Sequence, residues 1–109
     1  MNVFTVLCAA KAKIDKKENW TQGAYARDRM LRLSDCASPE ASCWCSVGAV
    51  WAVAPPGSEG AAFVPDAIDA LHKVARAAGY TNAIGLNDSG RHDAVLRMYS
   101  EAIEATRPA

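Results

Sequence analysis

An uncharged, strongly apolar window at residues 42–53 limits the folds open to this chain more than any other stretch. A polar, turn-rich run precedes it, and Pro55-Pro56-Gly57 follows it, where neither a helix nor a central strand can continue. The window is long enough for one buried helix. Small residues such as Gly48 favour a helix gripped by its neighbours, whereas Val, Trp and Cys would suit a buried strand. We expect the helix and keep the strand as the alternative.

If Gly48 lies in close helix contact, the substitution Gly48→Leu should unfold the domain, because overpacking a tight contact costs about 1–3 kcal/mol or more.

Three further stretches carry apolar residues at three- and four-residue steps, the pattern of amphipathic helices. The first spans residues 2–17 with Asn2 as N-cap, the second residues 63–79 with Pro65 in its first turn, and the third residues 93–107. Gly79 is expected to end the second of these helices. We therefore predict an all-α fold: one small helical domain at residues 1–109, a bundle of about four helices with ordered polar loops.

Four connections join or flank these helices. Residues 19–28 form an irregular, ordered segment in which Trp20 closes one end of the core, and residues 29–33 fit either a strand or a helical turn. Residues 55–60 have the composition of the most flexible loop. Residues 87–93 are expected to form a polar turn that leads into the last helix.

Composition restricts the class of partner. The chain has 12 Lys and Arg against 12 Asp and Glu, and a pI near 6.7, so it carries no long-range field that would attract nucleic acid or an anionic membrane. No window approaches the roughly 20 apolar residues of a membrane span, and no basic region precedes the short apolar start. We expect a cytoplasmic protein with reduced thiols at Cys8, Cys36, Cys43 and Cys45.

No complete catalytic or metal-binding set is visible. Cys43-x-Cys45 is too tight for a zinc knuckle and lacks a second pair, while neither His72 nor His92 has a dyad partner. Glycines at 79, 85 and 90 do not form a phosphate loop. We therefore expect no metal, no cofactor and no enzymatic activity.

Two polar loops are the best candidates for a binding surface. Asn87-Asp88-Ser89-Gly90-Arg91 collects amide, carboxylate, hydroxyl and guanidinium groups, although the same residues make an ordinary turn and helix cap. If the loop around Arg27 and Asp28 meets it at one pocket, a small ligand-binding domain or enzyme becomes the alternative function. The candidate ligand or partner surface comprises Trp20, Gln22, Tyr25, Arg27, Asp28, Asn87, Asp88 and Arg91.

Three stretches in this order, WTQGAYARD at 20–28, CWCSVGA at 43–49 and LNDSGR at 86–91, resemble a family of small bacterial and phage proteins of unknown function. Relatives often have tryptophan where this chain has Leu86 and threonine where it has His92. The resemblance brings no chemistry with it, but it implies a phage or mobile-element context. We expect a non-enzymatic protein-interaction module that binds a host protein complex such as a bacterial defence system. Inhibition of that complex, in the manner of an anti-CRISPR protein, is one concrete version.

Overall fold

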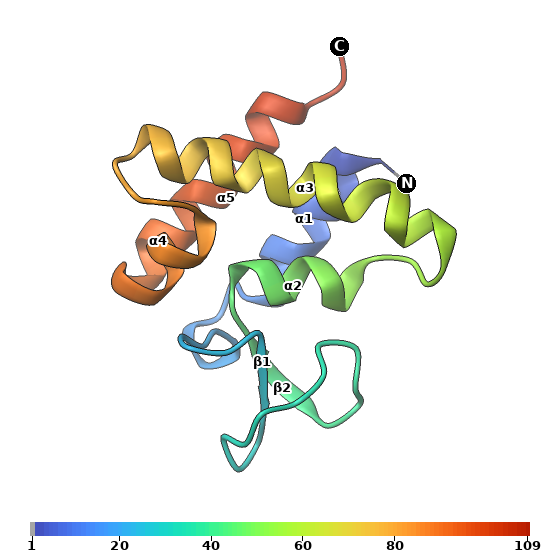
Figure 1. Ribbon diagram of the computed structural model, residues 1–109, viewed down its shortest axis with the longest axis vertical. Helices are drawn as coiled ribbons and strands as arrows, with labels where there is room; N and C mark the ends of the chain where they lie inside the picture. Colours follow the sequence, from blue (N-terminus) through green and yellow to red (C-terminus); the bar gives the residue numbers. More distant parts are fainter. Residues whose placement is uncertain (1) are drawn as a thin grey trace.

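The computed structural model describes residues 2–109. It places α1, α3, α4 and α5 at one end of the molecule and a small sheet at the other, with α2 between them (Figure 1). The elements are α1 Val3–Lys13, the 3₁₀ turn η1 Lys17–Asn19, β1 Ala26–Asp28, β2 Ala41–Trp44, α2 Ser46–Val53, α3 Ser58–Ala77, α4 Ala83–Ser89 and α5 His92–Thr106. The predicted all-α class is wrong, because β1 and β2 form a two-stranded antiparallel sheet. The fold is mixed α/β.

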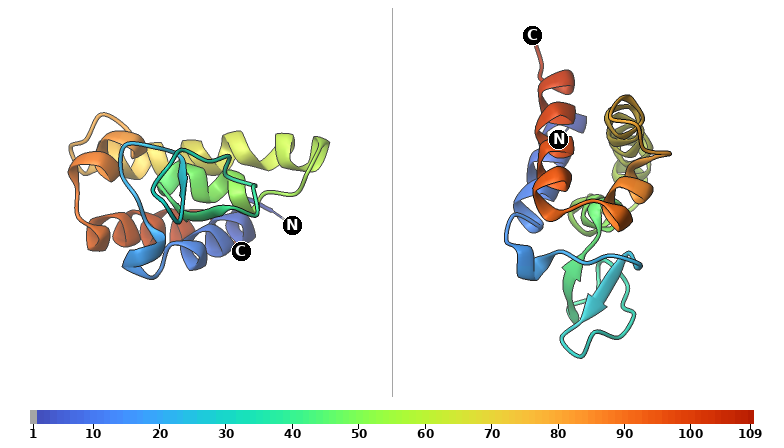
Figure 2. Two further views of the ribbon diagram at one scale, coloured as in Figure 1. Left: turned by 90° about the horizontal axis from the view of Figure 1, so that it is seen from below. Right: turned by 90° about the vertical axis from the view of Figure 1, so that its left-hand side faces the viewer.

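The helical end is built around α1, which packs against α2, α3 and α5. Figure 2 shows α1 and α5 together on one side of this end and α3 on the other. Asn2 forms the predicted N-cap in a reciprocal capping box with Thr5, but α1 ends at Lys13, four residues earlier than expected. Val6, Leu7 and Ala10 are its buried face.

The apolar window 42–53 divides at Cys45, so each of the two predicted alternatives holds for one part of it. Residues up to Trp44 belong to β2, where Ala26 lies opposite Trp44 and Arg27 opposite Cys43. Cys45 is then the N-cap of α2. A single helix over the whole window is wrong, because β1 satisfies the backbone of the first half through ladder hydrogen bonds.

Residues 29–33, left open between strand and helix, form a tight turn followed by an extended piece. Asp28 N–H donates to the Arg32 carbonyl at 2.9 Å and Ser34 N–H to the Ala26 carbonyl at 3.1 Å, so residues 32–34 run antiparallel along the outer side of β1. On the opposite side, Trp20 bridges Trp44 of β2. The sheet end is therefore wider than its two named strands.

The structure differs from the predicted loop at residues 55–60. α3 begins at Ser58, within the predicted flexible loop 55–60, and Pro65 lies inside the helix instead of in its first turn. Gly79 has the expected left-handed backbone, with φ +95°, just after α3.

The predicted polar turn 87–93 is wrong except at residues 90 and 91, because residues 87–89 belong to α4 and residues 92–93 to α5. The Asn82 side chain accepts from Gly85 N–H and caps this short helix, so the chain is already helical when it reaches Asn87. α5 follows with a buried stripe of Val95, Met98, Tyr99, Ala102 and Ile103.

Within residues 2–109, no helix combines the length and apolar character that crossing a membrane requires.

Candidate functional site

A buried asparagine joins three segments that are far apart in the sequence. Asn87, fully buried on α4, accepts two hydrogen bonds at its Oδ1, from Trp20 Nε1 at 2.7 Å and from Ser46 N–H at 2.9 Å. Its Nδ2 donates to the Thr21 carbonyl and to Asp88 Oδ1, both at 3.0 Å. An amide offers two acceptor and two donor positions, so the hydrogen-bonding capacity of Asn87 is filled within the protein.

The neighbours of Asn87 extend this junction. Gln22 Nε2 donates to the carbonyls of Asn87 and Gly90, at 2.9 and 3.0 Å, and Gly23 N–H donates to Asp88 Oδ1 at 3.0 Å. We call residues 20–23, 45–48 and 87–90 the three-segment junction. It contains part of each of the three sequence stretches that carry the family resemblance.

Gly48 brings the chain before β1 against the start of α2. A Cβ at this position would lie 1.9 Å from the carbonyl oxygen of Tyr25, closer than real side chains approach. The same carbonyl accepts from Cys45 N–H at 3.1 Å. The close contact expected at Gly48 is therefore present, but its partner is backbone at the sheet end and not another helix.

The thiol of Cys45 acts as a helix cap. Its Sγ accepts from Gly48 N–H at 3.2 Å, and burial raises the pKa of Cys45 to about 11. A neutral thiol is a poor nucleophile and a poor metal ligand, so Cys45 is chemically quiet near neutral pH. Burial also raises the pKa of Cys36.

Tyr99 supports the junction from the helical end. Its buried hydroxyl donates to the Ser46 carbonyl, and burial raises the pKa of Tyr99 well above its usual value. The Ser46 hydroxyl oxygen, also buried, has no hydrogen-bond partner within the described residues.

The turn after β1 is organised by Asp28. Its carboxylate accepts from the N–H groups of Met30 and Arg32 and pairs with Arg32 Nε at 2.9 Å. The Arg32 N–H is the largest cause of a lowered pKa at Asp28. Leu31, at the tip, has φ +63°, a left-handed backbone that residues other than glycine adopt at a cost.

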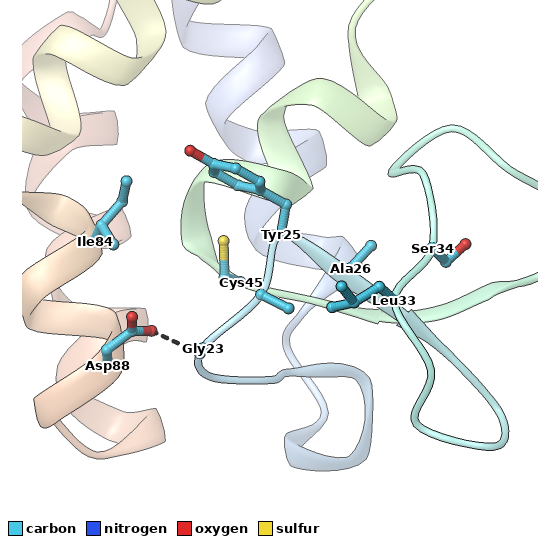
Figure 3. A pocket seen from close by; sticks show the side chains of 9 residues that line it. Gly23, Tyr25, Ala26, Leu33, Ser34, Cys45, Ile84 and Asp88 are labelled. Atoms are coloured by element: carbon cyan, nitrogen blue, oxygen red, sulfur yellow. Dashed lines mark hydrogen bonds between the residues drawn. The ribbon is translucent and has the colours of Figure 1, made fainter.

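A pocket of about 400 Å³ opens between the sheet end and α4. Figure 3 shows Ile84 and Asp88 of α4 on one wall, with Tyr25, Leu33 and Cys45 facing them across the opening. Most of the lining is apolar, and Asp88 is its one ionisable carboxylate. Such a lining suits an apolar side chain or small apolar group better than a charged ligand.

Large exposed apolar side chains collect around β1, and two of them, Tyr25 and Leu33, line this pocket. Five occur among the described residues, and four of them lie within residues 25–33, with exposed fractions of 54% for Tyr25, 73% for Met30, 67% for Leu31 and 76% for Leu33. The fifth, Trp51, lies on α2. We call the four the hairpin patch. Sequence reasoning missed three of them, although Arg-Met-Leu-Arg-Leu at 29–33 is apolar at positions where no helix or strand face was predicted to bury it.

With this geometry established, comparison with known proteins gives one match. The model of a protein family, described as Family of unknown function (DUF6197), matches residues 1–105 of the chain. The chain belongs to this family. No curated protein and no solved structure matches it. Membership therefore supplies no activity.

Four of the eight predicted site residues meet in the junction of this family member: Trp20, Gln22, Asn87 and Asp88. Arg27 touches its edge, because Arg27 Nη2 lies 3.5 Å from the Gln22 carbonyl. Tyr25 lines the pocket instead, and Asp28 closes its own turn.

The eighth predicted residue, Arg91, lies in a second, more polar pocket of about 450 Å³. Trp20, Gln22 and His92 are among its other lining residues, and the Trp20 and His92 rings are 5.3 Å apart. Arg91 is 88% exposed and lies 3.7 Å from Asp93.

Metal ligands do not gather among the side chains that the structure describes, because no three of their His, Cys, Asp or Glu groups are placed to hold an ion. All four cysteines are free thiols.

Proposed function

We propose that this protein is a non-enzymatic interaction module that binds another protein through its sheet end. The observation that carries the proposal is the hairpin patch. Four of the five large exposed apolar side chains share nine residues of sequence at one end of the molecule. Single exposed apolar residues need no explanation, but such a concentration of them in one short stretch supports an interaction surface.

The composition of the patch supports a protein partner. Tyrosine, methionine and arginine are enriched where proteins meet, and the patch combines Tyr25 and Met30 with neighbouring arginines such as Arg29. The balanced charge of the whole chain argues against nucleic acid or a membrane as the main partner.

The three-segment junction makes the patch a rigid platform. It ties residues 20–23 to α4 and the start of α2, so the chain entering β1 is fixed at its base. A fixed surface loses less conformational entropy on binding than a mobile loop does. The junction residues accordingly support binding from beneath, and the contact surface lies on the patch.

Our wider proposal is that the partner is a host protein or complex in the cytoplasm, for instance part of a bacterial defence system that this protein inhibits. The support is the resemblance to bacterial and phage proteins together with small size and neutral charge.

The test uses the whole protein as bait in lysates of candidate host bacteria. The wild type should retain a stoichiometric partner, and the double variant Met30→Glu/Leu33→Glu should lose it. Trp51→Glu is the control, because it places a negative charge on an exposed apolar side chain outside the patch. Equal capture by all three proteins, or no partner across hosts, would contradict the proposal.

A small ligand-binding domain is the second candidate function. It is favoured by the second pocket, where the predicted site residues Trp20, Gln22 and Arg91 share one lining. A thermal-shift screen of small anions and metabolites tests it. A stabilising compound whose effect disappears in Arg91→Ala would support this function over the first.

A further inference from the structure

The outer edge of the sheet end presents unpaired backbone. Residues 32–34 bond to β1 through Arg32 and Ser34, and Leu33 bridges Arg27 between those two bonds. In that antiparallel pattern the N–H and C=O of the middle residue point away from the partner strand. Consistently, neither backbone group of Leu33 has a hydrogen-bond partner within residues 2–109. One donor and one acceptor therefore face outward, side by side.

The same edge borders the apolar pocket. Leu33 and Ser34 line the pocket as well as forming the edge, and Tyr25 and Ile84 face them (Figure 3). A chain laid along the edge would thus run past the pocket opening. Backbone hydrogen bonds would fix its path, and a pocket would select one side chain, which is how added strands are recognised.

Charge distinguishes the two ends of this edge. Arg29 and Arg32 lie at its start, and the one acid beside them, Asp28, already accepts three hydrogen bonds from the turn. Arg29 has no ionic partner in the described part of the chain. At the other end, Asp35 follows Ser34, and Asp88 stands on the pocket wall. The groove therefore runs from positive to negative.

We propose that an extended segment of the partner protein adds to the edge at residues 32–34 as an antiparallel strand. It carries an apolar residue opposite Leu33 and acidic residues directly after that residue. The order follows from direction, because the C-terminal half of an antiparallel strand lies against the arginine end. This inference rests on the proposed function and specifies the chemical class of its partner.

The experiment pans a displayed library of short random linear peptides on the whole protein. The selected peptides should share an apolar residue followed by Asp or Glu, without proline at the apolar position. The best peptide is then synthesised and its affinity measured for the wild type, Leu33→Ala and Leu33→Pro. Proline removes the outward N–H of Leu33 without breaking an internal bond, whereas alanine keeps that donor.

Leu33→Pro should weaken binding by about tenfold or more relative to Leu33→Ala, a difference of about 1.4 kcal/mol. A second measurement leaves the protein unchanged and N-methylates the peptide one residue at a time. Methylation opposite Leu33 should abolish binding, while methylation of either neighbour, whose N–H points away from the edge, should not. This pattern keeps the test valid even if Leu33→Pro misfolds.

Two results separate this inference from the proposed function. Peptides whose binding does not alternate with the position of N-methylation, and which bind equally well to Leu33→Pro and Leu33→Ala, would overturn the added strand. A host partner that is lost in Met30→Glu/Leu33→Glu would still support the interaction module. A wild-type dimer in sedimentation that Leu33→Pro abolishes would also overturn it, because a second copy of this chain would then occupy the edge.

Discussion

The two ends of this molecule are stabilised in different ways. At the helical end, α1, α3 and α5 bury apolar stripes against one another, and nearly all of the largest fully buried side chains are aliphatic or aromatic. At the sheet end, short extended pieces are held to the rest by a buried amide, two tryptophan N–H groups and backbone contacts. This end also carries most of the exposed large apolar side chains. The first end supplies stability, and the second presents a surface.

This difference predicts where substitutions do most harm. Losing a methyl group at the helical end removes contact area, whose cost is spread over many neighbours. Removing one polar group from the junction leaves several hydrogen-bonding groups without a partner at once. Each buried donor that lacks an acceptor lowers the free energy of unfolding by about 1–3 kcal/mol. The largest effects should therefore come from the junction.

Asn87→Ala should cause the largest loss, roughly 3 kcal/mol or more of unfolding free energy, because it deprives Trp20 Nε1 and Ser46 N–H of their acceptor. Urea unfolding followed by circular dichroism and tryptophan fluorescence measures it. Asn82→Ala is the control, since it removes the same side chain from a helix cap and should cost about 1 kcal/mol. Equal losses in both variants would mean that the junction is no more than an ordinary cap.

Gly48→Ala should follow in size, at about 3 kcal/mol, because its Cβ would collide with the Tyr25 carbonyl and overpacking of this kind costs roughly 1–3 kcal/mol even where atoms can shift. Gly85→Ala is the matched control on α4. Its Cβ would lie 3.6 Å from Asn82 Oδ1, an ordinary contact, so the higher helix propensity of alanine should leave stability unchanged or raised. Calorimetric melting of both variants decides the point, and a stable Gly48→Ala would show that the two ends can separate at this contact.

Sequence reasoning succeeded where one periodic stripe sufficed. The Asn2 cap, the stripe of α3 and the Gly79 stop depend on neighbours within a few positions, so local patterns identify them. It failed at α4, where Asn87-Asp88-Ser89 has the composition of a turn. Asn82, five residues upstream, caps a helix that includes those residues.

The remaining errors arose from contacts between distant segments. Nothing in the composition of residues 42–45 reveals that residues 26–28 will pair with them, so the first half of the window looked helical. The site fared likewise. Trp20, Gln22, Asn87 and Asp88 were selected for their chemistry, but their convergence depends on bonds between residues more than sixty positions apart.

Alkaline pH should lower the free energy of unfolding through Cys45 by a smaller amount than the substitutions Asn87→Ala and Gly48→Ala do. The pKa of Cys45 is about 11 in the folded protein against 9.0 for a free thiol, so the unfolded chain loses its proton first as pH rises. The stabilisation is complete below pH 9 and is lost between pH 9 and 11, amounting to about 2–3 kcal/mol at most. Urea unfolding at pH 7, 9 and 11 should show a steeper decline for wild type than for Cys45→Ser, which keeps a capping oxygen but does not ionise. Parallel declines would place the alkaline sensitivity elsewhere, for instance at Tyr99, whose raised pKa acts with the same sign above pH 10.

The smallest expected effect has the opposite sign. Leu31 has φ +63°, a conformation that destabilises the folded state by about 1–2 kcal/mol. About two-thirds of its side chain is exposed, so burial offsets little of this strain. Leu31→Gly removes that strain at the expense of a more flexible unfolded chain, and the balance should be a gain of about 0.5–1 kcal/mol. Met30→Gly is the control, because Met30 has no positive φ and its replacement only makes the unfolded chain more flexible.

Calorimetry should show that Leu31→Gly is stabilised and Met30→Gly destabilised, while both variants lose the captured partner. Leu31 would then lower the stability of the fold while it contributes to binding. In the described chain, the helical end contains no comparable backbone strain. Strain that is confined to an exposed tip, where it lowers stability, is expected of a surface that serves binding.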